Sequence, residues 1–139
     1  MKKNKKILFY SPDFNLCLSL LVYLQDKYVI TTTTDLSVVK AIADSSNFNL
    51  LLMDTEPSGV IENICEGIKS KDVNIPIILT YVYKTQFSEF EEKIKKLVSS
   101  VFYKPYDLNE ISLKLNSLMA SWFSCPINTS KKVIFIKIL

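Results

Sequence analysis

Four polar residues lie at or just beyond the ends of apolar runs, where together they could form a small site. Asp54 follows the run LLLM, Thr80 ends the run PIILT, and Lys104 follows VFY. Asp13 comes three residues after another such run, ILFY, and adds a second acid. Each run is typical of a strand that is buried on both faces. Ligands bind beyond the carboxyl ends of parallel strands, so we expect these carboxylate, hydroxyl and ammonium groups to line one site there.

The residues that are missing exclude several kinds of chemistry. The chain has no histidine, and Ser-His-Asp triads, Cys-His pairs, imidazole zinc ligands and phosphohistidine donors all need one. With only Gly59 and Gly67, the chain has no phosphate-binding P-loop and no dinucleotide-binding turn. Cys17, Cys65 and Cys125 are far apart and form no CxxC motif, which favours a reducing cytosol.

Length and charge indicate one soluble domain without a nucleic-acid partner. The chain has 139 residues, of which 48% are hydrophobic and 22% charged. Its formal charge of +3 comes from lysines near both ends, and no arginine is available to contact bases. The apolar stretch 16–24 is too short to cross a bilayer, and Ser11-Pro12-Asp13 interrupts the signal-like start. We therefore expect a cytoplasmic protein that is not inserted in a membrane.

Apolar runs alternate with segments of helical periodicity along the chain. The expected strands cover residues 7–10, 28–32, 49–53, 76–80 and 101–103. In the first expected helix, the apolar residues at helical spacing are Phe14, Cys17, Leu18, Leu21 and Leu24. Strands that are apolar throughout need helices on both faces, so the pattern predicts a doubly wound α/β domain with five parallel strands.

We place this domain at residues 6–122, between two extensions. Residues 1–5 form a basic extension at the N-terminus. Residues 123–139 form a C-terminal extension that includes an apolar, strand-like segment at 133–139. Such a segment could pair with a sheet edge of its own chain or of a partner.

Asp54, Thr80 and Lys104-Pro105, in this order and spacing on alternating strands and helices, resemble the receiver domain of two-component response regulators. The resemblance covers about residues 5–121. It implies a flavodoxin-like fold with strand order 2-1-3-4-5. It also implies that Asp54 accepts a phosphoryl group from a histidine kinase or phosphotransfer protein, while Lys104 and Thr80 bind the phosphoryl oxygens.

The same resemblance implies a phosphoprotein that signals to a downstream protein. The surface near the fourth helix, the fifth strand and the fifth helix would change, and a homodimer is possible. Such a domain is a signalling module rather than an enzyme, with at most self-catalysed gain and loss of the aspartyl phosphate.

The family holds magnesium with the acceptor and with adjacent acids after the first strand. In this sequence Ser11 and Pro12 take the places of those acids. The magnesium ligands that the resemblance suggests are therefore Asp54, Asp13 one position late, and Glu56 through its carboxylate or its backbone carbonyl, and we expect weak binding.

Two more departures leave an alternative function open. Tyr81 stands where the family favours a small residue, and it could shield Asp54. Val101 stands where an aromatic switch residue is common. The alternative is a pseudo-receiver that binds partner proteins without being phosphorylated.

Each candidate residue also has a structural interpretation. Asp54 could cap the turn before the third helix, and Asp13 could cap the first helix. Thr80 has ordinary strand propensity, and Lys104 could be an exposed strand end. Only the relative positions of these side chains can decide between the two interpretations.

Overall fold

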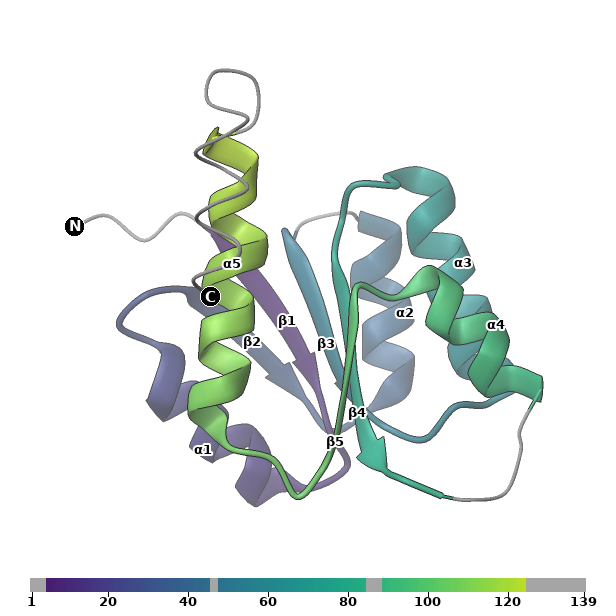
Figure 1. Ribbon diagram of the computed structural model, residues 1–139, viewed down its shortest axis with the longest axis horizontal. Helices are drawn as coiled ribbons and strands as arrows, with labels where there is room; N and C mark the ends of the chain where they lie inside the picture. The colour runs from purple at the N-terminus through teal and green to yellow at the C-terminus, as the bar shows by residue number, and fades with distance from the viewer. Residues whose placement is uncertain (1–4, 46–47, 85–88, 125–139) are drawn as a thin grey trace. The chain divides into compact units, whose positions relative to one another are not determined.

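A computed structural model describes residues 5–45, 48–84 and 89–124 of the chain (Figure 1). These residues form five strands and five helices in alternation. The strands are β1 (Lys6–Tyr10), β2 (Val29–Thr33), β3 (Leu50–Asp54), β4 (Ile77–Val82) and β5 (Ser100–Lys104). The helices are α1 (Phe14–Leu24), α2 (Leu36–Ser45), α3 (Gly59–Lys71), α4 (Glu89–Leu97) and α5 (Leu108–Ser124). All strand pairs are parallel, in the order β2-β1-β3-β4-β5, which confirms the predicted fold class.

The described residues fall into two compact units. The first ends at Pro105 and contains the sheet with α1 to α4, and the second begins at Tyr106 and contains α5. Asp107 precedes α5, and its Oδ1 accepts a hydrogen bond from Asn109 N at 2.9 Å, as expected for a residue that caps the helix. The segment 133–139 lies outside the described residues. So does Phe87, whose helical spacing with Phe90, Ile94 and Leu97 predicts that it belongs to the fourth helix.

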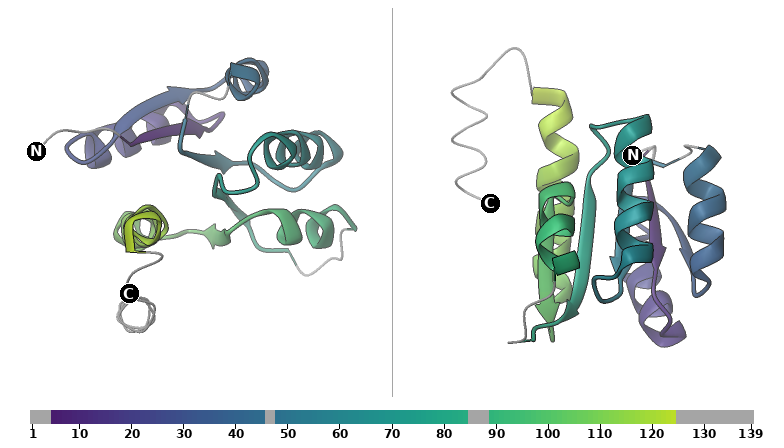
Figure 2. Two further views of the ribbon diagram at one scale, coloured as in Figure 1. Left: turned by 90° about the horizontal axis from the view of Figure 1, so that it is seen from above. Right: turned by 90° about the vertical axis from the view of Figure 1, so that its right-hand side faces the viewer.

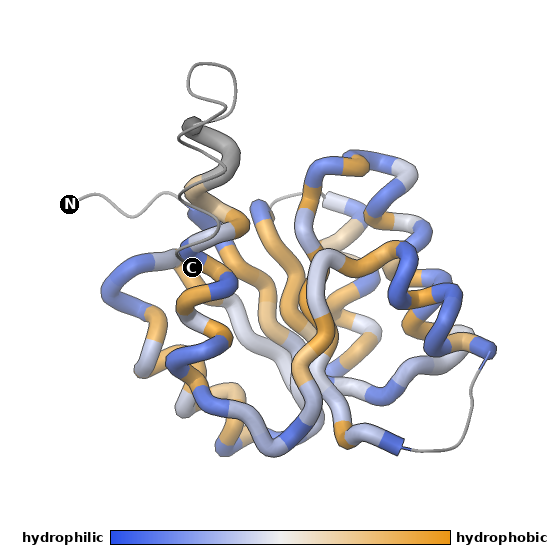
Figure 3. Tube along the Cα trace, in the orientation of Figure 1, coloured by the Kyte–Doolittle hydropathy of each residue, from blue (hydrophilic) through white to orange (hydrophobic). Residues whose placement is uncertain are grey.

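The sheet of the first unit is covered on both faces. Helices α2, α3 and α4 lie along one face, and α1 lies on the other (Figure 2, left). Every residue of the central strand β3 is buried, and the hydropathy of the chain is highest along the central strands (Figure 3). The four α3 residues that pack into the core have the helical spacing that predicts one apolar face, and they are Ile61, Ile64, Cys65 and Ile68. Continuous apolar strands therefore do need the two helical layers.

The expected inner face of the first helix was partly wrong. The buried residues of α1 are Cys17, Leu20 and Leu24, whereas Phe14 and Leu18 are exposed. This helix is apolar around most of its circumference, so periodicity alone did not distinguish one row of residues from the next. Among the described helices, none combines the length and hydropathy that a membrane span requires.

We predict that Leu51→Ala lowers the free energy of unfolding by about 2 to 5 kcal/mol, because Leu51 is fully buried between β1 and β4. Urea denaturation followed by circular dichroism measures this. The matched control is Leu18→Ala at a half-exposed position, which should cost no more than about 1 kcal/mol. Equal losses at the two positions would contradict the assigned core.

Candidate functional site

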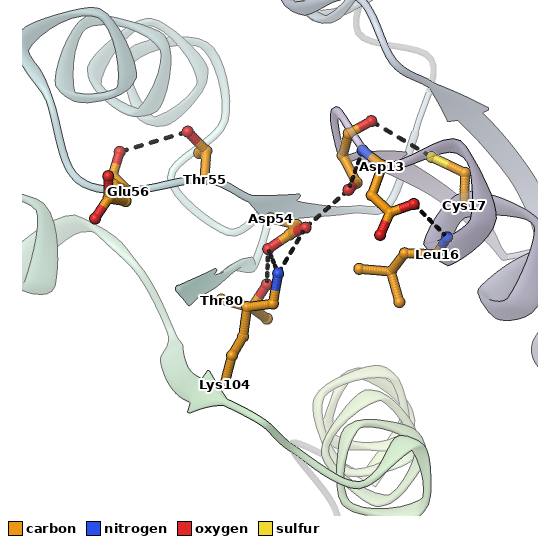
Figure 4. Close-up of polar contacts among 9 residues, drawn as sticks. Asp13, Leu16, Cys17, Asp54, Thr55, Glu56, Thr80 and Lys104 are labelled. Atoms are coloured by element: carbon orange, nitrogen blue, oxygen red, sulfur yellow. Dashed lines mark hydrogen bonds and ion pairs between the residues drawn. The ribbon is translucent and has the colours of Figure 1, made fainter. Parts of the chain in front are cut away.

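The sheet brings Asp54, Thr80 and Lys104 together at the carboxyl ends of its strands. Asp54 ends β3 and is in register with Thr80 of the neighbouring β4, while Lys104 ends β5. The Thr80 hydroxyl donates to Asp54 Oδ1 at 3.1 Å. Lys104 Nζ lies 3.1 Å from Oδ1 and 3.3 Å from Oδ2 of the same carboxylate (Figure 4). The convergence expected from the sequence is therefore present.

Ser11 is a fourth member of this site, although a serine at this position was expected to be a poor substitute for a carboxylate. Its hydroxyl donates to Asp54 Oδ2 at 2.8 Å, the shortest of the contacts to this carboxylate, and Ser11 is fully buried. The same oxygen accepts the backbone N–H of Asp13 at 3.0 Å, which orients the hydroxyl. Its position directly after β1 indicated that Ser11 could reach the site. Only a carboxylate was expected to have a role at this position, as a magnesium ligand.

Asp54 is a buried charge whose two oxygens both have hydrogen-bond donors. The residue is 5% exposed, and Thr80 beside it is 0% exposed. Burying a carboxylate without a counter-charge costs free energy of folding. The half-buried Lys104 ammonium supplies that counter-charge to Asp54. The negative charge of Asp54 also acts on Tyr10: burial raises the pKa of Tyr10, and Asp54 raises it further.

A cavity of about 500 Å³ opens beside Asp54. The residues that line it are Pro12, Asp54, Thr55, Glu56, Pro57, Ser58, Tyr81, Val82 and Lys104. Four of these nine residues form the turn between β3 and α3. Ser58 ends this turn and caps α3, because its hydroxyl accepts a hydrogen bond from Ile61 N. A small anionic group could therefore reach both the carboxylate and the ammonium group from this side.

The other two acids that were expected to join the site have different partners. Asp13 Oδ1 accepts hydrogen bonds from Asn15 N and Leu16 N, so this side chain caps α1. The Glu56 carboxylate forms an ion pair with Lys84 Nζ at 2.5 Å, and Figure 4 shows it apart from Asp54, beyond Thr55. Within the described part of the chain, no three acidic or cysteine side chains gather closely enough to hold a metal ion. These residues do not fit the carboxylate set that magnesium prefers.

Tyr81 is buried and connects the site to α4. Its hydroxyl donates to Glu91 Oε2 at 2.7 Å, and its ring packs edge-on against Tyr103 with centroids 5.5 Å apart. Lys95 Nζ donates to the Tyr103 hydroxyl at 3.0 Å and lies 3.8 Å from Glu91. Burial, followed by the hydrogen bond to Glu91, raises the pKa of Tyr81. Val101, at the position of the expected aromatic switch, packs against the core instead.

Comparison with solved structures finds the same fold in response regulators. A two-component response regulator from Clostridium difficile matches with a TM-score of 0.70 and 18% identity, over 84% of this chain and 97% of that one. The regulator TrrA from Thermotoga maritima, in complex with Mg²⁺-BeF, matches with a TM-score of 0.68 and 23% identity, over 83% and 99%. An orphan response regulator of H. pylori matches with a TM-score of 0.69 and 14% identity, over 85% of this chain and 98% of that one. No protein-family model matches the sequence, and no curated protein does so significantly.

The resemblance inferred from the sequence is thus confirmed at the level of structure. The chain has the fold of response-regulator receiver domains over most of its length. The carboxylate of Asp54 lies at the edge of the sheet where such a fold gathers its strand ends.

We predict that Lys104 and Asp54 are coupled in stability. Lys104→Met leaves the buried carboxylate without its counter-charge, and it should destabilise the protein by about 1 to 3 kcal/mol. The same substitution made in Asp54→Asn should cost much less, because no charge remains to be compensated. Urea denaturation of the four variants gives the coupling energy, and additive effects would contradict the contact.

We also predict that Tyr81 contributes to loss of stability at alkaline pH. Because the folded state raises the pKa of Tyr81, this residue's contribution is complete below the unfolded pKa of about 10 and falls as the pH rises above it. Tyr81→Phe should cost about 1 kcal/mol at neutral pH and make unfolding less sensitive to pH above about 10. Thermal unfolding between neutral pH and pH 11 tests this, and Tyr83→Phe at an exposed position is the control. A parallel pH dependence in Tyr81→Phe and wild type would contradict the prediction.

Proposed function

We propose that this domain is a response-regulator receiver that accepts a phosphoryl group on Asp54. The observation that supports it best is the contact of one buried carboxylate with the Lys104 ammonium and the Thr80 hydroxyl at the wall of an open cavity. The donor would be the phosphohistidine of a histidine kinase or phosphotransfer protein, since this chain contains no histidine. The protein would then belong to a two-component system.

The proposed step needs only groups that the site holds and one that the partner brings. An Asp54 oxygen attacks phosphorus, the P–N bond to the partner's imidazole breaks, and an O–P bond forms. The imidazole nitrogen keeps the electron pair and takes a proton from solvent. The Lys104 ammonium stabilises the negative charge on the phosphoryl oxygens, which is the main requirement of phosphoryl transfer. Thr80 can then turn its hydroxyl from Asp54 Oδ1 to a phosphoryl oxygen.

The signal would leave the site through β4 and α4. Thr80 and Tyr81 are consecutive in β4, and the Tyr81 hydroxyl holds Glu91 of α4. A shift of Thr80 toward a phosphoryl group would therefore move the backbone that positions Tyr81. A downstream protein could read the change on the surface of α4 and β5, where Tyr83 and Tyr103 are exposed.

One observation favours a second candidate, a partner-binding module that is never phosphorylated. Ser11, Thr80 and Lys104 already satisfy both oxygens of Asp54. An incoming phosphoryl group has to displace one of these contacts, and a strongly held carboxylate is a weaker nucleophile. In this case the four residues would act as a structural network.

Acetyl phosphate distinguishes the two candidates. We predict that the full chain, incubated with acetyl phosphate in the presence of Mg²⁺ and then weighed intact, gains the mass of one phosphoryl group. Asp54→Asn should abolish the gain, and Lys104→Met should slow it because the developing charge is no longer compensated. Glu56→Gln serves as a control, since this side chain pairs with Lys84 on the rim of the cavity. No gain, or a gain that persists in Asp54→Asn, would contradict the proposal and leave the partner-binding module.

A further inference from the structure

We infer that the Asp54 site works without a divalent cation and that Ser11 is the residue that determines this. The Ser11 hydroxyl donates to Asp54 Oδ2, one of the two carboxylate oxygens that a cation could bind. The part of the inference that concerns phosphoryl transfer rests on the proposed function, whereas the part that concerns cation binding does not.

The charges at the site do not favour a dication. Asp54 carries one negative charge, and the Lys104 ammonium 3.1 Å away balances it. Asp13 and Glu56 are engaged by the N-terminus of α1 and by Lys84. A magnesium ion at Asp54 would gain attraction from one carboxylate and meet repulsion from the ammonium group at a similar distance. Its affinity depends on the number of charged oxygen ligands, and here that number is one.

The hydrogen bonds at Ser11 leave only one lone pair of its hydroxyl oxygen for an ion. Ser11 Oγ donates to Asp54 Oδ2 and accepts the N–H of Asp13, so its hydrogen and one of its lone pairs are in use. Asp54 Oδ2 also accepts a hydrogen bond from Lys104 Nζ at 3.3 Å, so a cation bound to Oδ2 would have to displace the Ser11 hydroxyl or the ammonium group. Ser11 is fully buried, so water could not restore the lost bond. Pro12, which follows, has no side-chain oxygen to contribute.

The same hydroxyl can serve a bound phosphoryl group. An acyl phosphate on Asp54 would keep one carboxyl oxygen as a carbonyl acceptor, to which Ser11 could continue to donate. Lys104 would then be the cation that neutralises the phosphoryl oxygens. The transfer in the acetyl phosphate reaction balances without a metal: the P–O bond to acetate breaks, acetate leaves with the electron pair, and Asp54 forms the new O–P bond.

A substitution at Ser11 should create the missing cation site. Ser11→Asp places a second carboxylate beside Asp54 Oδ2, so that the local charge becomes negative. We expect the full chain to show no saturable Mg²⁺ binding by isothermal titration calorimetry, and Ser11→Asp to bind Mg²⁺ at least about tenfold more tightly. Ser11→Ala removes the hydroxyl without adding charge and should not bind the ion. Asp54→Asn in the Ser11→Asp background should abolish the new binding.

Saturable Mg²⁺ binding by the wild-type chain that Asp54→Asn removes would overturn the inference. So would a folded Ser11→Asp variant that gains no affinity. If Ser11→Asp does not fold, the wild-type titration and the acetyl phosphate reaction still decide. The rate of phosphorylation of the wild-type chain should be the same in EDTA and in Mg²⁺. A rate that requires Mg²⁺ overturns the inference and leaves the proposed function standing. No phosphorylation in either condition overturns the proposed function, and the titration alone then tests the inference.

Discussion

The burial of one carboxylate is the constraint on which the rest of the site depends. Removing Asp54 from water costs several kcal/mol unless its charge is compensated and its oxygens are hydrogen-bonded. The strand order supplies these partners, because β3 lies between β1 and β4. Ser11 follows the last residue of β1 and Thr80 lies in β4, so two short side chains reach Asp54 from the neighbouring strands' positions. Lys104 comes from β5, one strand farther away, and only a long side chain can reach the carboxylate from there.

The hydrogen bonds to Asp54 stabilise the fold, and a modification of this carboxylate would change them. The donors that stabilise the carboxylate are the groups that could bind a phosphoryl group, so a modification at Asp54 rearranges contacts on three strands at once. Thr80 is continuous with Tyr81, and Tyr81 holds α4 through Glu91. In the described residues, no buried side-chain nitrogen or oxygen lacks a hydrogen-bond partner. If Ser11, Thr80 or Lys104 turns away from Asp54, a hydrogen bond of the carboxylate is lost and has to be replaced. The conformation of the site therefore depends on the groups around it.

The sequence was sufficient for the fold and for the convergence of Asp54, Thr80 and Lys104, but it placed Asp13 and Glu56 in the site wrongly. Uninterrupted apolar strands need two helical layers, and the parallel sheet then places Asp54, Thr80 and Lys104 at one edge. Contacts that depend on the register of the strands or on the rotation of a helix about its axis could not be predicted from the sequence. Ser11 resembles an ordinary turn residue, and its contact with Asp54 spans 43 positions. The Tyr81–Glu91 contact depends on how α4 is rotated against β4, and the buried face of α1 could not be chosen because apolar residues surround that helix.

Fold and chemistry depend on different residues in this protein, and this explains how the fold can persist at 14–23% identity to the solved structures described above. The sheet requires apolar residues at the buried positions of β1, β3 and β4, and many side chains satisfy that requirement. The site requires particular atoms, and exchanging a carboxylate for a hydroxyl after β1 changes its charge by one unit without disturbing a strand. Since Ser11 lies in the turn after β1 and not in the sheet, its side chain can be altered while the sheet still brings Asp54 and Lys104 together. We infer that the choice between a cation and a hydroxyl at this site depends on this one turn residue, which lies outside the sheet.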